Sequence, residues 1–281
     1  MYEQYPPRRL FVPPEYHRAR ADDVDLAFAI VTPSYEQREF LEEAIASVRN
    51  QSYPRIHYTV QDGASSDGSV ELLASYGDHL DWRSEPDQGQ ADAINRGFRR
   101  VSGEIMAWLN SDDVLAPGAI PYVARFFARN PDVDIVYGHR IYIDTVGREV
   151  GRCILPRHDG EALRWADYVP QETLFWRRRV WDAIGPLDTS FRYALDYDFI
   201  LRALRAGFTF ARLPRFLGMF RVHPAQKTAT MQQLGNSETA RLHLDHLGYA
   251  PTAAEIRRRI KPYLKRHMWL DIFYRLGFVR F

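Results

Sequence analysis

The segment that decides the fold is IHYTVQDGASSDG, at residues 56–68. Apolar and polar side chains alternate over 56–60, which is the pattern of a half-buried β-strand. The strand runs into a polar turn, and a helix is expected after it, with Ser66 or Asp67 suited to cap its first turn. A strand that leads through a polar turn into a helix is the repeating unit of α/β proteins.

The same unit recurs on both sides of this segment. Upstream, the apolar run at 26–31 predicts a buried strand, and apolar residues at helical spacing over 40–48 predict a helix after it. Downstream, we expect strands at 80–84, 104–109 and 134–137, with helices at 88–101 and 117–129. Strands that alternate with helices predict a doubly wound, mainly parallel α/β sheet.

The rhythm changes after Gly138. Two strand-like stretches flank Val146-Gly147 and predict a hairpin, within a smaller α+β region. Its other expected elements are a short helix at 159–166, a strand at 172–176 and helices at 180–184 and 197–206. The chain therefore divides into an irregular, proline-rich arm at 1–25, an α/β domain at 26–235 with halves at 26–137 and 138–235, and a basic helical extension at 236–281.

Composition narrows the class of protein. The 281 residues are 46% hydrophobic, enough for one sizeable core and a smaller appendage. With 37 Lys and Arg against 36 Asp and Glu, the strong positive charge of a nucleic-acid binder is absent. Cys153 is the single cysteine, so no disulfide can form within the chain. Neither a signal peptide nor a membrane-spanning run is evident, and we expect a cytoplasmic protein, soluble or attached to the inner face of the membrane.

Polar residues follow three of the predicted strands, at 32–35, 62–68 and 110–113. Ligands of open α/β sheets bind beyond the carboxyl ends of the strands, so one cleft could gather all three segments. Adjacent carboxylates at Asp112 and Asp113 suit Mg²⁺ or Mn²⁺, with a diphosphate completing the shell. Two simpler readings stay open: the two aspartates shape a turn, and 62–68 is a helix-capping loop.

The stretch from Ala29 to His223 resembles the family 2 glycosyltransferases, which have the GT-A fold. Four motifs carry the resemblance in order: IVTPSY at 30–35, VQDGASSDG at 60–68, GQADAINRG at 89–97 and LNSDD at 109–113. The resemblance implies that the half at 26–137 binds a nucleotide-sugar, and that the half at 138–235 holds the acceptor and the catalytic base.

The resemblance also implies roles for single residues. Asp62 would accept a hydrogen bond from the nucleobase, Asp112 would contact ribose or sugar, and Asp113 would ligate the metal. Asn110 replaces the acid common at its position and is left out of the metal shell. The other implied donor-binding residues are Thr32, Pro33, Tyr35, Ser65, Asp92 and Asn95. The implied acceptor-side residues are Gln171, Glu172 and Asp198, although a surface strand end explains the first two equally well.

The segment YALDYDFILR at 193–202 resembles the family's catalytic-base region, and Asp196 aligns with the base. Asp198 is the weaker candidate for the base, because it falls inside the first helical turn. FRVHPAQKT at 220–228 resembles the loop that closes over the donor, where His223 would reach metal or phosphate, unless it is structural. Glu161 begins a superficial match to the motif of processive synthases, which we interpret as coincidence.

The resulting hypothesis is an inverting, non-processive transferase that uses Mn²⁺ or Mg²⁺ and a nucleotide-sugar, UDP-linked by resemblance. Its acceptor would be a hydroxyl of a glycan or lipid-linked glycan in cell-surface polysaccharide synthesis, with no nucleic acid as partner. The rivals are a nucleotidyltransferase and a catalytically silent scaffold. Residues 256–281 hold eight Lys and Arg against one Asp, interleaved with aromatic residues. Such a helix either lies on an anionic membrane or packs on the domain.

Overall fold

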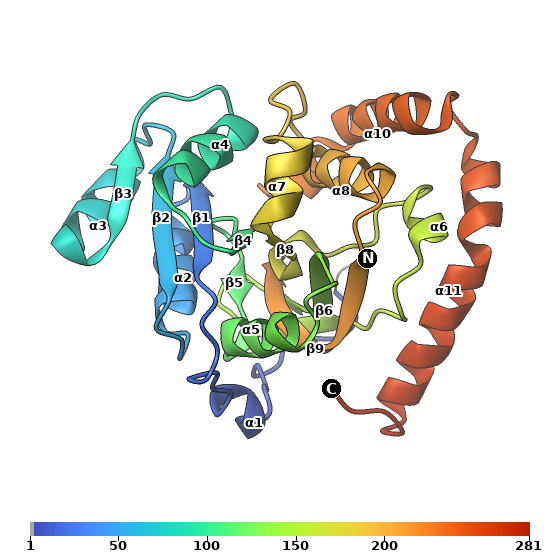
Figure 1. Ribbon diagram of the computed structural model, residues 1–281, viewed down its shortest axis with the longest axis horizontal. Helices are drawn as coiled ribbons and strands as arrows, with labels where there is room; N and C mark the ends of the chain where they lie inside the picture. The colour runs from blue at the N-terminus through green and yellow to red at the C-terminus, as the bar shows by residue number, and fades with distance from the viewer. Residues whose placement is uncertain (1–2) are drawn as a thin grey trace.

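The computed structural model describes residues 3–281. Nine strands form one mixed sheet in the order β3-β2-β1-β4-β8-β6-β9-β5, with β7 paired to the free side of β6. Helices cover the sheet, with α3 beside β3 at one end of the molecule and α11 at the opposite end (Figure 1). Buried clusters fill both faces: one contains Trp108, Trp176 and Phe199, and the other contains Phe28 and Phe175. The predicted α/β fold class is confirmed.

The first half is the parallel part of the sheet. β1 pairs in parallel with β2 on one side and β4 on the other, and β3 extends β2. Every residue of β1 is buried, as expected for the continuous apolar run at 26–31. The elements are β1 (Phe28–Ser34), α2 (Arg38–Arg49), β2 (Ile56–Asp62), α3 (Ser69–Ser75), β3 (Asp81–Ser84), α4 (Gln90–Arg100), β4 (Ile105–Trp108), β5 (Val114–Leu115) and α5 (Ala119–Arg129).

Helix α3 begins three residues later than position 66. Gly68 has a φ of 94°, a left-handed conformation that ends the loop just before the helix. The Asp67 carboxylate accepts the backbone N–H groups of Ser69 at 3.0 Å and Arg38 at 2.8 Å. Of the two proposed caps, Asp67 therefore binds the first turn of α3 and also ties it to α2.

The second half is built around β6. The predicted hairpin is confirmed, since β6 and β7 pair antiparallel and Gly147 lies in the turn with a φ of 78°. The strand expected at 134–137 and the first strand of the predicted hairpin are one continuous strand, β6. The elements are β6 (Ile135–Ile143), β7 (Glu149–Cys153), α6 (Gly160–Leu163), the 3₁₀ turn η2 (Gln171–Thr173), β8 (Phe175–Arg177), α7 (Arg178–Ile184), α8 (Leu195–Arg205) and β9 (Phe210–Arg221).

Two expectations for this half were wrong. The strand expected at 172–176 is the turn η2 followed by β8, because η2 packs its buried side chains into the sheet edge. The long strand β9 was not expected at all. It pairs in parallel with β6 and antiparallel with β5, so it joins the acidic strand end to the second half. Gly218 of β9 also allows the turn η2 to pack closely against this strand, since a Cβ at residue 218 would lie 2.6 Å from the Glu172 Cγ atom.

The C-terminal helices are α9 (Lys227–Thr230), α10 (Gln232–Leu247) and α11 (Ala253–Arg275). The division expected at residue 235 falls within α10, so the extension begins inside a helix that also contacts the domain. Within residues 3–281 the helices are too short or too polar for any of them to cross a bilayer.

The proline-rich arm is fixed to the sheet. It contains one short helix, α1 (Pro14–His17), and Arg8 forms an antiparallel bridge with Glu149 on β7. The Glu149 side chain is fully buried and accepts hydrogen bonds from Tyr5, Arg8 and Arg152, with the Arg152 Nε–Oε1 distance at 2.9 Å. Burial by itself would raise the pKa of Glu149, but these hydrogen bonds outweigh it and lower the pKa to about 2.

We predict that Glu149→Gln lowers the free energy of unfolding near pH 7 by about 3 kcal/mol, because it leaves Arg152 and Arg8 without their buried counter-charge. The carboxylate stabilises the fold fully above its ordinary pKa of 4.5, and this contribution is lost as the pH falls toward 2. Urea denaturation of both proteins should therefore show a difference that shrinks over this range. A difference independent of pH would contradict the assignment.

Candidate functional site

A cleft of about 1240 Å³ lies beyond the carboxyl ends of β1 and β4 and is closed on its other side by the second half of the chain. Of the sequence-predicted residues, those that line it are Pro33, Tyr35, Asp112, Asp113, Gln171, Glu172 and Asp196. The cleft therefore gathers residues from both halves of the domain, in the position where open α/β sheets bind ligands.

Behind one end of the cleft, Asp62 closes the loop that follows β2. Its buried carboxylate accepts the backbone N–H of Ser65 at 2.9 Å, the Ser65 hydroxyl at 2.6 Å and the Ser84 hydroxyl at 2.7 Å. Asp62 itself does not reach the cleft surface, but its neighbour Gly63 does. Tyr35 lies beside this loop with 65% of its surface exposed, so a large aromatic face is available to a planar ligand.

Several predicted residues serve the fold rather than the cleft surface. Thr32 is buried and accepts a hydrogen bond from the Tyr58 hydroxyl at 2.9 Å. Asn95 exchanges two hydrogen bonds with the backbone of Leu187, at 2.9 and 3.0 Å. Asp92 accepts the Gln88 N–H and pairs with Arg96 at 2.7 Å, and Asp198 pairs with Arg202 at 2.8 Å. None of these four predicted residues is among those that line the described cleft.

From the helix motif at 89–97, the cleft is lined instead by Gly89 and the first turn of α4, together with residues 86–88 of the loop before it. Asp87, which was not predicted, packs directly against Gly63, where a Cβ would lie 2.9 Å from the Asp87 Oδ2 atom. Burial raises the pKa of Asp87. The absence of a side chain at residue 63 therefore makes room for the Asp87 carboxylate at this end of the cleft.

The acidic turn that follows β4, at residues 110–113, is held by contacts from the end of β9 and from His223 just beyond it. Asp113 is buried and accepts the Arg221 N–H at 3.1 Å, and the Asp112 carboxylate lies 3.1 Å from the His223 Nε2 atom. His223 thus contacts the acidic motif, although it does not itself line the cleft. Burial, and then the charges of Asp112 and Glu172, raise the pKa of Asp113 well above its usual range.

Glu172 is neutralised by a neighbour in the same cleft. Its side chain is fully buried, and Arg140 binds it through both Nε, at 2.7 Å, and Nη2. Gln171 bridges the two halves, accepting from Asn110 at 3.0 Å and donating to the Trp108 carbonyl at 2.9 Å. Arg140 was not predicted, because it lies in the middle of a strand with no recognisable motif.

Asp196 lies in the first turn of α8, and its carboxylate accepts the N–H of Tyr197 at 2.9 Å. A second carboxylate, Asp167, lines the cleft near it. Burial raises the pKa of both Asp196 and Asp167. The charge of Asp196 raises the pKa of Asp167 further. Sequence reasoning missed Asp167, since it lies in a segment without periodicity or motif.

The loop before Asp196 is fixed from outside the predicted domain. Glu238 of α10 is buried, and its carboxylate accepts the backbone N–H groups of Arg192, Tyr193 and Ala194 at 2.8–2.9 Å. Lys227 lines the cleft and donates to the Gln90 side chain at 2.5 Å and to the Arg192 carbonyl at 3.1 Å. Glu238 and Lys227 thus each join the segment before Asp196 to another part of the chain.

No set of three or more His, Cys, Asp or Glu side chains within residues 3–281 is arranged to hold a metal ion. The oxygen atoms of Asp112 and Asp113 still fit a hard divalent cation. Burial first, and the charges of Asp112 and Glu172 second, raise the pKa of Asp113, and a bound cation would offset those charges. A cation here would take its remaining ligands from water and from a bound phosphate group.

Curated relatives and solved structures match this chain over most of its length. An uncharacterized glycosyltransferase of Rickettsia prowazekii is 27% identical over 212 residues, covering 72% of this chain and 66% of the relative. A PGL/p-HBAD biosynthesis glycosyltransferase of Mycobacterium bovis is 28% identical over 180 residues, covering 62% of this chain and 68% of the relative.

Two solved structures share the fold. TarS residues 1–349 from S. aureus in complex with UDP-GlcNAc align with a TM-score of 0.64 and 16% identity, covering 86% of this chain and 72% of that one. The mannosyltransferase PcManGT from Pyrobaculum calidifontis, in complex with GDP-Man and Mn²⁺, aligns with a TM-score of 0.64 and 18% identity, covering 96% and 74%. Against the longer TarS chain, this protein spans only 43% of the length.

The model of glycosyl transferase family 2 matches residues 29–196, from β1 to the aspartate at the start of α8. This is the stretch that builds most of the cleft, and it includes the three polar strand ends. With the GT-A fold, the ordered motifs and this match in agreement, the chain belongs to glycosyl transferase family 2.

Proposed function

We propose that this protein transfers a sugar from a nucleotide-sugar, UDP-linked, to a hydroxyl group of a glycan or lipid-linked glycan, with inversion at the anomeric carbon. The observation that carries the proposal is that Asp113 and Asp196, from opposite halves of the domain, line one cleft. TarS is known with UDP-GlcNAc and PcManGT with GDP-Man, which supports a nucleotide-sugar in the same place. The mycobacterial relative, named for PGL/p-HBAD biosynthesis, supports a biosynthetic role for the transfer.

The donor would lie between the loop at 62–68 and the acidic strand end. Tyr35 and Pro33 offer an apolar surface to the base, over the turn that Asp62 and Ser65 hold closed. Asp113, with Asp112, would hold Mn²⁺ or Mg²⁺, which when bound supplies positive charge to the departing diphosphate. Lys227 adds a cationic side chain on the same wall of the cleft.

Asp196 would take the proton from the acceptor hydroxyl as that oxygen attacks the anomeric carbon. A carboxylate whose pKa is raised by burial is a better base than an ordinary aspartate. Asp167 and the Arg140–Glu172 pair line the same side of the cleft, where they would bind other hydroxyl groups of the acceptor. A single displacement by the acceptor oxygen inverts the configuration.

The nucleotidyltransferase and the silent scaffold both fit less well. Family membership favours sugar transfer over nucleotidyl transfer. A scaffold has no need for a buried glutamate on another helix that accepts three backbone N–H groups from the loop before Asp196.

Two substitutions should separate the proposed roles. Asp196→Asn is expected to lower kcat by at least about a hundredfold with nearly unchanged affinity for the nucleotide-sugar, because it removes only the base. Asp113→Ala is expected to abolish the binding of the donor that depends on Mn²⁺. Calorimetric titration of nucleotide-sugars, with and without Mn²⁺, and a turnover assay measure both effects. Full turnover in Asp196→Asn would refute the assignment of the base.

Glu238 would act as a positioning residue for Asp196. We predict that Glu238→Gln lowers kcat by roughly tenfold to a hundredfold, because a neutral amide holds three N–H groups less firmly and the base moves. The affinity for nucleotide-sugar should stay within about twofold, which a general loss of structure would not permit. Glu161→Gln, at an exposed glutamate, is the matched control. Equal losses of kcat and of donor affinity would contradict a positioning role.

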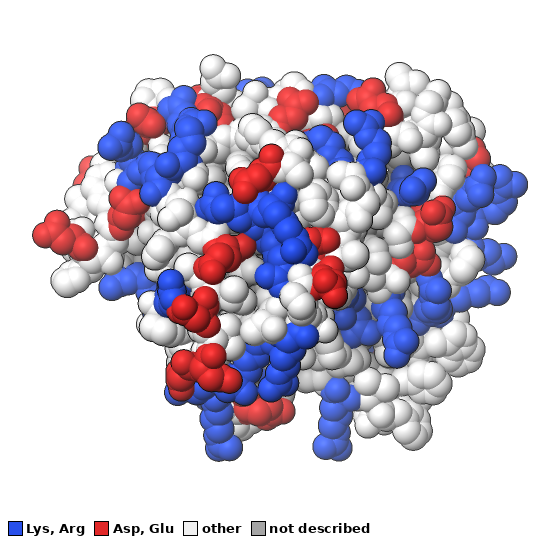
Figure 2. Space-filling view, viewed as in Figure 1, with Lys and Arg blue, Asp and Glu red and all other residues white. Residues whose placement is uncertain are grey.

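Helix α11 has one face packed on the domain and one face in solvent. Packing on the domain therefore describes one face, and contact with an anionic membrane remains a proposal for the other face. Tyr263 is buried and stacks on Tyr168 at 4.1 Å, and Tyr274 accepts a hydrogen bond from Arg152 at 2.7 Å. The exposed apolar residues at this end of the chain, which we name the α11 apolar row, are Leu264, Met268, Trp269, Phe273, Leu276 and Phe278. Figure 2 shows Lys and Arg side chains along the same side of the molecule.

We propose that the α11 apolar row lies in the headgroup region of an anionic membrane. Aromatic and aliphatic side chains flanked by Lys and Arg are the composition of an interfacial helix. Leu264, a member of the row, also lines the cleft, as does the neighbouring His267. One end of the row therefore lies at the mouth of the cleft. This arrangement suits an acceptor whose lipid stays in the membrane while its glycan enters the cleft.

The double substitution Trp269→Ser and Phe273→Ser is expected to weaken binding to anionic vesicles by about tenfold or more, because it removes two exposed aromatic side chains from the row. Liposome flotation measures the effect. Val146→Ser with Leu244→Ser removes two apolar residues that are similarly exposed elsewhere and serves as the control. If both double variants float like the unsubstituted protein, the row does not bind membrane.

A further inference from the structure

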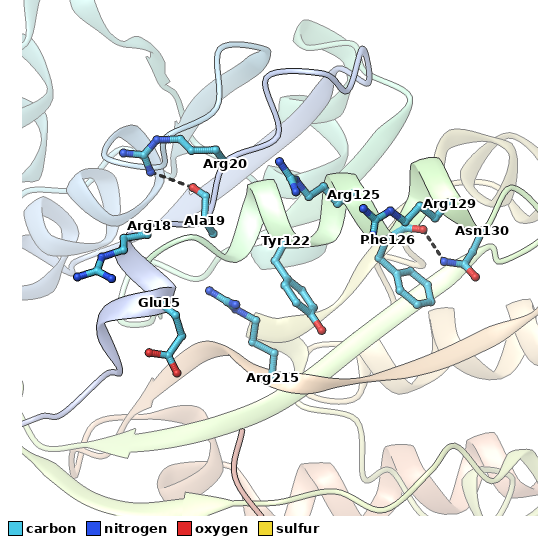
Figure 3. A pocket seen from close by; sticks show the side chains of 10 residues that line it. All are labelled: Glu15, Arg18, Ala19, Arg20, Tyr122, Arg125, Phe126, Arg129, Asn130 and Arg215. Atoms are coloured by element: carbon cyan, nitrogen blue, oxygen red, sulfur yellow. Dashed lines mark hydrogen bonds between the residues drawn. The ribbon is translucent and has the colours of Figure 1, made fainter.

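A second pocket, of about 580 Å³, lies between α1, α5 and β9 (Figure 3). It shares no lining residue with the cleft among residues 3–281. Its walls carry one acidic side chain, that of Glu15, against five arginines: Arg18, Arg20, Arg125, Arg129 and Arg215. Figure 2 shows that Lys and Arg side chains also gather on the surface over α5. We name this site the Arg215 pocket.

Arg215 is the unusual member of the group. The residue is buried, with 9% of its surface exposed, and its guanidinium carbon lies 3.8 Å from the centre of the Tyr16 ring and 4.6 Å from that of Tyr122. Its Nε and Nη2 atoms are buried and have no hydrogen-bond partner in the described part of the chain. Burying charged N–H groups without an acceptor is costly, and the cost disappears when an anion accepts from them.

The rim of the pocket supplies further positive charge. Arg20 donates to the carbonyls of His17 and Ala19, and Arg125 lies 3.5 Å from Asp23. Arg18 and Arg129 are exposed, and neither has an ion pair within residues 3–281. These two rim arginines can therefore donate to a ligand without breaking an ion pair, and such a ligand would lie beside the unpartnered N–H groups of Arg215.

We propose that the Arg215 pocket binds a phosphate-bearing anion, at a site separate from the donor cleft. Guanidinium groups match phosphate oxygens geometrically, because each presents two parallel N–H donors. The volume is ample for a diphosphate or a phosphorylated sugar rather than a single inorganic ion. The same chemistry is offered by a soluble phosphate ester and by the headgroup of an anionic phospholipid, and the experiment below distinguishes the two.

Inorganic pyrophosphate serves as the soluble probe, titrated calorimetrically into the full chain in EDTA so that metal-dependent binding in the cleft is suppressed. The second arm uses sedimentation with vesicles of phosphatidylglycerol and phosphatidylcholine, compared with phosphatidylcholine alone. The test variant is Arg18→Glu with Arg129→Glu, both exposed and outside the cleft. The control is Arg83→Glu with Arg99→Glu, which changes the net charge equally at exposed arginines that line neither pocket.

The test variant is expected to weaken one of the two probes by about tenfold or more relative to the control. Selective loss of pyrophosphate binding identifies a soluble phosphate ester, and selective loss of vesicle binding alone identifies a phospholipid headgroup. Arg215→Gln, with folding checked by circular dichroism, should reproduce the same loss. If the test and control variants behave alike with both probes, the proposal is overturned.

Discussion

Negative charge crowded into one cleft is the constraint on which the rest of the site depends. Asp112, Asp113 and Glu172 approach one another in surroundings largely closed to water, where like charges repel strongly. Arg140 offsets the negative charge of Glu172 by donating two hydrogen bonds to its carboxylate. The His223 ring lies beside the Asp112 carboxylate. Asp113 accepts the Arg221 backbone N–H and the Asn110 amide, and within residues 3–281 no cationic side chain is hydrogen-bonded to it. The fold thus leaves its excess charge at the strand end, beside the space proposed for the diphosphate.

Segments beyond the family match complete this arrangement. The match ends at residue 196, yet β9 brings Arg221 and His223 onto the acidic strand end, and α10 brings Glu238 under the loop before Asp196. Lys227 then connects that loop to Gln90 in the first half. The proposed base is therefore positioned by residues that lie outside the family match.

The parallel half of the fold could be predicted because β1 follows a continuous apolar run, β2 begins with alternating apolar and polar residues, and the helices between the strands keep their apolar spacing. The strand β9 could not, because Pro214, Gly218 and several arginines interrupt any alternation, and its place is decided by pairing with β6 and β5. Motif positions also located the cleft correctly through Asp112, Asp113 and Asp196, which all line it.

Motif position could not give the direction of each side chain. Thr32, Asp92, Asn95 and Asp198 belong to the motif segments, but Tyr58, Arg96, Leu187 and Arg202 hold them away from the cleft. Conversely, Asp167 and Arg140 carry no signal of their own and reach the cleft through the packing of the second half. Such contacts depend on residues far apart in the sequence, and local patterns do not encode them.

The long helix at the edge of the molecule sets a length scale for the chemistry. Leu264 belongs both to the cleft wall and to the row of exposed apolar residues, and Phe273 of the same row lies nine positions further along the helix, a rise of about 14 Å. An interfacial helix lies in the plane of the bilayer, so with that row in the headgroups the mouth of the cleft would open at the membrane surface. The position of the helix would then favour acceptors whose reactive hydroxyl lies within a short distance of the lipid.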